Sequence, residues 1–120
     1  MIDAKKARKL VRDYVKANPG TSFVELERLF DRHGIDWRGP LALCFPGHPS
    51  MIMWNGWSQE ASDVLAGLYK DHIVDFEYGP NLRMVYFIDG KMLKLPTAKS
   101  ERDYVSDRWM PVVLDPGDNA

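Results

Sequence analysis

Cys44 and His48 are the two side chains whose types and spacing could support covalent catalysis, since they lie four residues apart. A thiol beside an imidazole forms an active pair only when a third group orients the base. No residue near this pair marks such a group. His33 and His72 lie in separate segments, and no paired-ligand spacing supports a zinc site that includes Cys44. The sequence therefore predicts no enzyme, no metal and no cofactor.

Basic side chains offer a different chemistry, the non-covalent binding of phosphate groups. Residues 1–35 carry eight basic and five acidic side chains, whereas residues 36–80 carry two basic and six acidic ones. A phosphate-binding surface is therefore expected from the first helix and the C-terminal third. The predicted DNA-contacting residues are Lys5, Lys6, Lys9, Arg12, Arg83, Lys91 and Lys94. The alternative is that these residues only form a solvated face.

Tryptophan side chains point to a second kind of binding, between proteins. Trp54 and Trp57 lie in an inserted segment, and Trp109 begins an apolar stretch that runs to residue 114. Aromatic residues are enriched at the centres of protein interfaces. Trp54, Trp57 and Trp109 are therefore the predicted partner-binding residues. Because tryptophan is also common in domain cores, simple packing is the alternative.

Length and composition limit the possible classes of protein. The chain has 120 residues, 45% of them hydrophobic and 28% charged, which is typical of one globular domain. A net charge of -1 excludes a generally basic nucleic-acid coat. One cysteine excludes an internal disulfide, and the apolar runs are too short to span a membrane. We therefore expect a cytoplasmic protein with no membrane partner.

Three helices can be read from apolar periodicity and end signals. The first covers about residues 4–17, with Asp3 as its N-cap. The second opens with a capping box, in which Ser22 and Glu25 each satisfy a free backbone N–H of the other. The third begins after Ser58, where apolar residues again recur at helical spacing.

The hydrophobic period changes from 3.6 to 2 after the third helix. Residues 74–78 alternate as a half-buried strand, residues 84–88 form a second strand, and residues 91–95 form a third after an Asp-Gly turn. These strands predict a three-stranded antiparallel meander. The insertion at 35–57, between the second and third helices, is predicted to be a hairpin because two apolar runs flank a Pro-Gly-His-Pro turn.

This order of elements gives an α+β fold. Residues 1–96 are expected to form the domain, and residues 97–120 a C-terminal extension packed on it, with the last few residues frayed. The segment Asn18–Ser22, followed by an apolar helix, resembles the junction of the first two helices in winged-helix domains. Residues 58–74 resemble the third helix of that family entering its wing. The resemblance implies a winged-helix-like core with the strands after residue 74 as the wing.

The chain is also similar to small uncharacterised proteins of phages, prophages and pathogenicity islands. This resemblance rests on Trp54-Asn55-Gly56-Trp57, on the Asp89-Gly90 turn with residues 93–96, and on the stretch 109–114. It implies an origin in a mobile genetic element and brings no established activity.

The function expected from these observations is regulation by non-covalent binding. The outer face of the third helix carries Glu60 and Asp63, which repel phosphate, so contact with double-stranded DNA is expected through the first helix and the wing. The alternative is a protein-interaction module of the same fold that binds a host or phage protein without binding DNA. The sequence does not define the oligomeric state.

Overall fold

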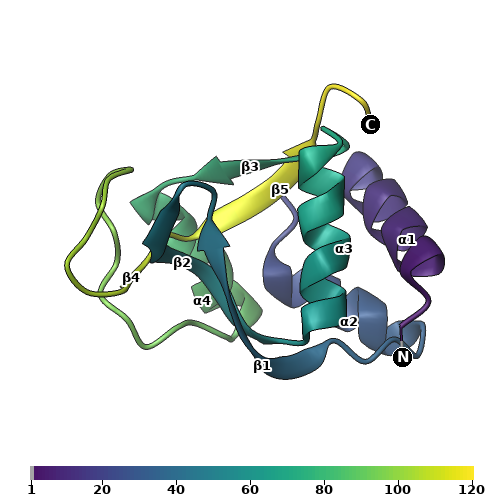
Figure 1. The fold of residues 1–120 in the computed structure, drawn as a ribbon, viewed down its shortest axis with the longest axis horizontal. Coiled ribbons are helices and arrows are strands. Elements are labelled where there is room, and N and C mark those ends of the chain that lie inside the picture. The colour runs from purple at the N-terminus through teal and green to yellow at the C-terminus, as the bar shows by residue number, and fades with distance from the viewer. Residues whose placement is uncertain (1) are drawn as a thin grey trace.

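The computed structural model describes residues 2–120, which form an α+β domain (Figure 1). The helices are α1 (Ala4–Ala17), α2 (Phe23–Arg32), α3 (Gln59–Lys70) and α4 (Arg83–Asp89), with a short 3-10 turn η1 (Pro80–Leu82) before α4. The strands are β1 (Arg38–Phe45), β2 (His48–Trp57), β3 (Val74–Tyr78), β4 (Arg108–Trp109) and β5 (Val112–Pro116).

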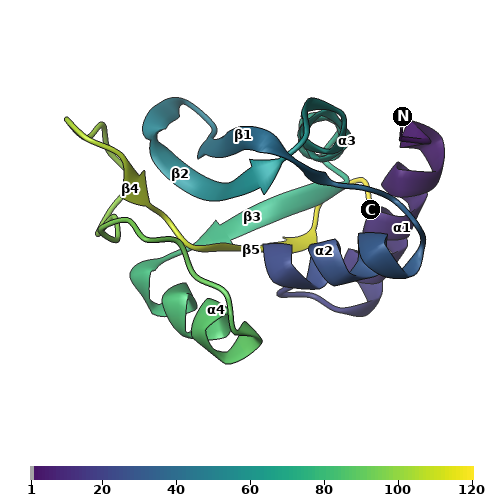
Figure 2. The same cartoon turned by 90° about the horizontal axis from the view of Figure 1, so that it is seen from below.

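The strands form two small sheets. In the first, β2 lies between β1, to which it is antiparallel, and the short strand β4, to which it is parallel. In the second, β3 pairs with β5 in antiparallel register, with Phe76 opposite Leu114. Figure 2 shows the β3–β5 pair between the β1–β2 hairpin on one side and α2 and α4 on the other. The first sheet is therefore mixed and the second antiparallel.

The three predicted helices are confirmed, because their signals are local. The Asp3 side chain accepts a hydrogen bond from the Lys6 N–H (3.1 Å) and caps α1. The capping box of α2 is complete: Ser22 Oγ accepts from the Glu25 N–H (3.1 Å), and Glu25 Oε2 accepts from the Ser22 N–H (2.8 Å). Ser58 caps α3 in the same way. The hairpin in the insertion and the strand at 74–78 are also present.

The prediction of strands at 84–88 and 91–95 is wrong. Residues 83–89 form α4, and residues 91–95 form no strand. The Asp-Gly pair expected to turn a hairpin ends this helix instead, since Gly90 has φ 86° and the Lys91 N–H bonds the Tyr86 carbonyl (3.1 Å). The strand that pairs with β3 is β5, which is distant in sequence. The three-stranded meander and the wing expected from it are therefore not formed.

The C-terminal segment is part of the core. Trp109, Val112 and Leu114 are fully buried, and β5 is bonded along its length to β3. The last residues, which were expected to be frayed, make backbone hydrogen bonds: the Gly117 N–H donates to Ile73 (2.9 Å) and the Asn119 N–H donates to His72 (2.8 Å). Residues 108–119 therefore complete the fold.

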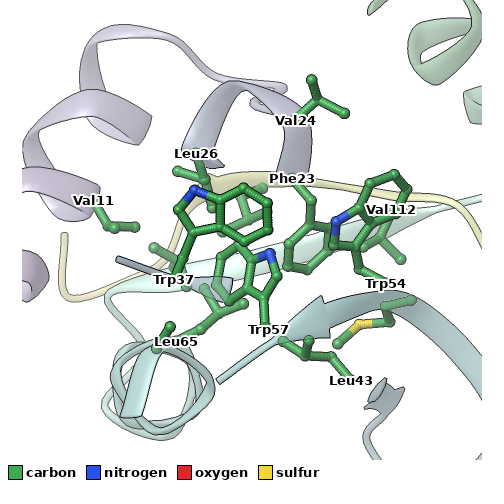
Figure 3. Packing of buried hydrophobic residues seen from close by; sticks show 14 of the residues in the cluster. Val11, Phe23, Val24, Leu26, Trp37, Leu43, Trp54, Trp57, Leu65 and Val112 are labelled. Atoms are coloured by element: carbon green, nitrogen blue, oxygen red, sulfur yellow. The ribbon is translucent and has the colours of Figure 1, made fainter. Parts of the chain in front are cut away.

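An aromatic cluster fills the space between α2 and the β1–β2 hairpin. Phe23 stacks on Trp54, with ring centroids 6.1 Å apart, and meets the edge of Trp57 at 5.4 Å. Trp37 lies 6.4 Å from Trp57 on the other side. Figure 3 shows these rings together with aliphatic side chains from α1, α3 and β5. This core holds every helix against the sheets.

Candidate protein-docking surface

Helix α4 is fixed to the core by Tyr86. The Tyr86 ring is fully buried and packs 4.9 Å from Trp54 and 5.4 Å from Trp109. Its hydroxyl donates to the carbonyl of Val112 and accepts from the Phe23 N–H (3.2 Å). Burial raises the pKa of Tyr86 above its ordinary value, so the phenol stays protonated. One short helix is thereby tied to both α2 and β5.

The opposite side of α4 exposes three large apolar side chains. Met84 is 58% exposed, Phe87 64% and Ile88 78%. Residues at i, i+3 and i+4 lie on one face of a helix, so these side chains are neighbours. Exposed apolar side chains that lie next to one another are a feature of interaction sites.

Basic groups border this patch. Arg83, at the start of α4, is exposed. At the end of the helix, Arg28 reaches across from α2 and donates Nη2 to the Asp89 carbonyl (2.9 Å). The Asp89 carboxylate turns inward and accepts from Ser22 Oγ (2.6 Å). We call Arg28, Arg83, Met84, Phe87 and Ile88 the α4 surface; it is apolar at its centre and positively charged at both ends.

Removing the Tyr86 hydroxyl tests how firmly α4 is anchored. Tyr86→Phe leaves a buried N–H and a buried carbonyl without their partner, so it is expected to lower the free energy of unfolding by about 1–3 kcal/mol. Tyr69→Phe is the matched control, because the Tyr69 hydroxyl makes no hydrogen bond in the described structure, and it should stay within about 0.5 kcal/mol of wild type. Denaturant unfolding measures both. Equal losses in the two variants would contradict the anchoring role.

The predicted DNA-contacting residues do not form one surface. Lys5, Lys9 and Arg12 line a shallow groove of about 260 Å³ between α1 and α3, together with Arg8, which is paired with Asp71 (2.8 Å). Lys6, also on α1, borders another pocket. Arg83 and Lys94 belong to α4 and the segment after it, on a different side of the molecule from α1 (Figures 1 and 2).

Lys91 lies at the edge of the core, with 46% of its side chain exposed. Its ammonium donates to Glu27 Oε1 (2.8 Å) and lies over the rings of Trp37 (4.9 Å) and Trp54 (5.4 Å). This predicted phosphate contact is therefore engaged in an ion pair, and its contact with DNA stays a prediction.

The three tryptophans predicted to bind a partner are core residues. Trp54, Trp57 and Trp109 have no exposed surface. The indole N–H groups of Trp54 and Trp57 both donate to Glu27 Oε2, at 2.8 and 3.0 Å, and that of Trp109 donates to the Met53 carbonyl (3.2 Å). An interface requires accessible side chains, so these tryptophans do not form a docking surface in this fold; the packing alternative describes them.

The ring nitrogens of His48 face carboxylates rather than Cys44. The His48 ring nitrogens lie 3.0 Å from Asp103 Oδ1 and 3.2 Å from Glu101 Oε2, and Tyr78 donates its hydroxyl to the second oxygen of Glu101 (2.8 Å). Burial, with a smaller effect of Asp107, raises the pKa of the Cys44 thiol. A protonated thiol is a poor nucleophile. Among residues 2–120, no group of His, Cys, Asp and Glu side chains could hold a metal ion.

His48 links the hairpin to the segment 98–107 in a pH-dependent way. Its hydrogen bonds to Asp103 and then to Glu101 raise the pKa of His48 above 6.5. Hydrogen bonds from Tyr78 and then from His48 lower the pKa of Glu101 below 4.5. The protonated imidazole therefore stabilises this link below pH 6.5 and loses that effect as the pH rises through its folded pKa. The ionised Glu101 stabilises the link above pH 4.5 and loses that effect as the pH falls.

We expect the link to be strongest between pH 4.5 and 6.5. An NMR titration of the imidazole should give a His48 pKa above 6.5 in the wild-type protein, and Asp103→Asn should lower it. A His48 pKa at its ordinary value, unchanged by Asp103→Asn, would show that the link does not persist in solution.

Among the described residues, no helix is long and apolar enough to cross a membrane. Comparisons with protein-family models, curated proteins and solved structures find no match to this chain. The resemblances to winged-helix domains and to mobile-element proteins therefore stay predictions.

Proposed function

We propose that this protein is an interaction module that binds another protein through the α4 surface. The observation that carries the proposal is the exposure of Met84, Phe87 and Ile88 on one face of a helix whose other face is fixed in the core. Such a face pays little ordering cost on binding, because the helix is already formed and anchored. Regulation within a mobile genetic element, as the sequence resemblance implies, is part of the same proposal.

The charges around the patch define the partner's chemistry. Arg83 and Arg28 lie at the two ends of α4, while the Asp89 carboxylate faces inward to Ser22. An amphipathic helix with an apolar stripe and acidic flanks complements this arrangement, since its stripe covers the patch and its carboxylates meet the two arginines.

A titration monitored by NMR tests this proposal directly. The probe is a synthetic helical peptide with leucine at i, i+3, i+4 and i+7 and glutamate at the flanking positions; the control peptide has lysine in place of glutamate. We expect saturable shifts of the α4 amides with the acidic peptide and weaker binding of the basic one, more so at low salt. No shift in α4 with the acidic peptide would contradict the proposal.

A second candidate function is nucleic-acid binding by α1. It is favoured by the placement of Lys5, Lys9 and Arg12 along one groove. The winged-helix resemblance is part of this second proposal, since α1, α2 and α3 follow one another in the order that the resemblance implies. If α1 binds phosphates, the affinity for labelled duplex DNA falls by orders of magnitude between about 50 and about 200 mM salt. Replacing these three residues by glutamine should then abolish binding. Fluorescence anisotropy measures both, and no binding at the lower salt concentration excludes this function.

A further inference from the structure

An apolar recess lies in a part of the molecule that includes no residue of α4. It has a volume of about 340 Å³, is open to solvent on one side and is bordered by the β1–β2 hairpin, α3 and β3. Buried side chains of Leu43, Met53 and Leu65 line it, and Tyr69 stacks on Phe76 beside them, with ring centroids 4.9 Å apart. Figure 3 shows Leu65 of α3 and Leu43 of the hairpin on either side of Trp57. A recess of this size and composition is typical of sites for small molecules.

Ser62 also lines the recess, but its Oγ is shielded from solvent, so a polar contact to a ligand has to come from another group.

The charge of the recess is negative. Asp63, the neighbour of Ser62 on α3, lines it and accepts a hydrogen bond from Gln59 Nε2 (2.8 Å). Among the described residues that line the recess there is no lysine, arginine or histidine. Asp107 adds a negative charge near Cys44, at the hairpin side of the same recess. The site therefore favours a cation over an anion.

We propose that this recess binds a small aromatic or aliphatic molecule that carries a protonated amine. The apolar body lies against Leu43, Met53 and Phe76. An ammonium can form a charge-assisted hydrogen bond to the Asp63 carboxylate, which lines the same recess. This inference is independent of the α4 surface, because no residue of α4 lines the recess.

Three probes of nearly equal size separate shape from charge: phenethylamine, 2-phenylethanol and phenylacetate. In NMR titrations of the whole protein, we expect saturable shifts in residues 41–44 and 62–69 with phenethylamine. The neutral alcohol should bind about tenfold more weakly, as expected for the loss of one charge-assisted interaction. Phenylacetate should not bind. Equal affinity for the three probes, or no saturable shift with phenethylamine, would overturn the proposal.

Variants on α3 test whether phenethylamine binds in this recess. Ala66 lines the recess and is exposed, so Ala66→Trp should fill it and abolish binding, whereas Lys70→Trp, outside the recess on the same helix, should not. Asp63→Asn changes only an exposed side chain and should remove the preference for the amine over the alcohol. Phenethylamine binding that survives Ala66→Trp would contradict the assignment.

Discussion

Glu27→Leu is expected to lower the free energy of unfolding by about 2–5 kcal/mol, because it removes the acceptor of two buried indole N–H groups. The Glu27 side chain is only 6% exposed, and its Oε2 accepts from both Trp54 (2.8 Å) and Trp57 (3.0 Å). Leucine keeps the volume of the side chain but offers no acceptor, so both indoles stay buried and unsatisfied. The effect is large for a domain of this size.

Denaturant unfolding followed by tryptophan fluorescence measures this effect. Glu77→Ala on β3 is the control, because Glu77 is exposed and makes no side-chain hydrogen bond in the described structure; its effect should lie within about 0.5 kcal/mol. Lys91→Met should cost less than Glu27→Leu, since both indoles keep their acceptor. If Glu27→Leu behaves like Glu77→Ala, the carboxylate does not hold the aromatic core together.

Phe87→Ser is expected to weaken binding of the acidic amphipathic peptide at least about thirtyfold, which corresponds to the loss of one central interface residue, about 2 kcal/mol. Phe87 is 64% exposed and lies between Met84 and Ile88 on the α4 surface. Because it contributes little to the core, the free energy of unfolding should stay within about 0.5 kcal/mol of wild type. Peptide titration and denaturant unfolding measure the two quantities separately.

Val105→Ser is the matched control for Phe87→Ser. Val105 is the most exposed of the large apolar side chains among the described residues, at 109%, and lies in the segment 98–107, outside the α4 surface. The same kind of change there should leave peptide affinity unaltered. Equal losses of affinity in the two variants would mean that the peptide binds exposed apolar groups without selecting α4.

The helices with local end signals were predictable from the sequence, and α4 was not. Three helices are capped by the side chains of Asp3, Ser22 and Ser58. Each of these side chains accepts a hydrogen bond from a backbone N–H only three residues further along the chain. In contrast, residues 84–88 are rich in aromatic and β-branched side chains, which favour strands. Tyr86 and its distant partner Val112 hold this segment as a helix, and that contact lies beyond any local pattern.

Because residues 84–88 were predicted to form a strand, the candidate site on α4 was not predicted either. In a strand, residues 84, 86 and 88 share a face, so Tyr86 would lie beside Met84 and Ile88. In the helix, Tyr86 turns into the core and Phe87 joins Met84 and Ile88 outside. The proposed docking surface therefore follows from the helical period and is absent from the strand prediction.

Glu27 was missed although the sequence holds a signal for it. Glu27 is four residues after Phe23 and three before Phe30, so it lies on the apolar face of the second helix. A carboxylate in that position requires buried donors. Trp54 and Trp57 are the donors, but they come from the hairpin, and helical periodicity alone does not show which residues face Glu27.

Site-specific photo-crosslinking tests the central claim most directly. A photoreactive phenylalanine analogue is placed at position 87 and, as the control, at position 105 of the whole protein, and cells that naturally produce the protein are irradiated. The proposal predicts a discrete protein adduct from position 87 that is absent from position 105 and that is lost when Met84 and Ile88 are also changed to serine. No adduct at position 87, or the same adducts from both positions, would contradict the assignment of α4 as the docking surface.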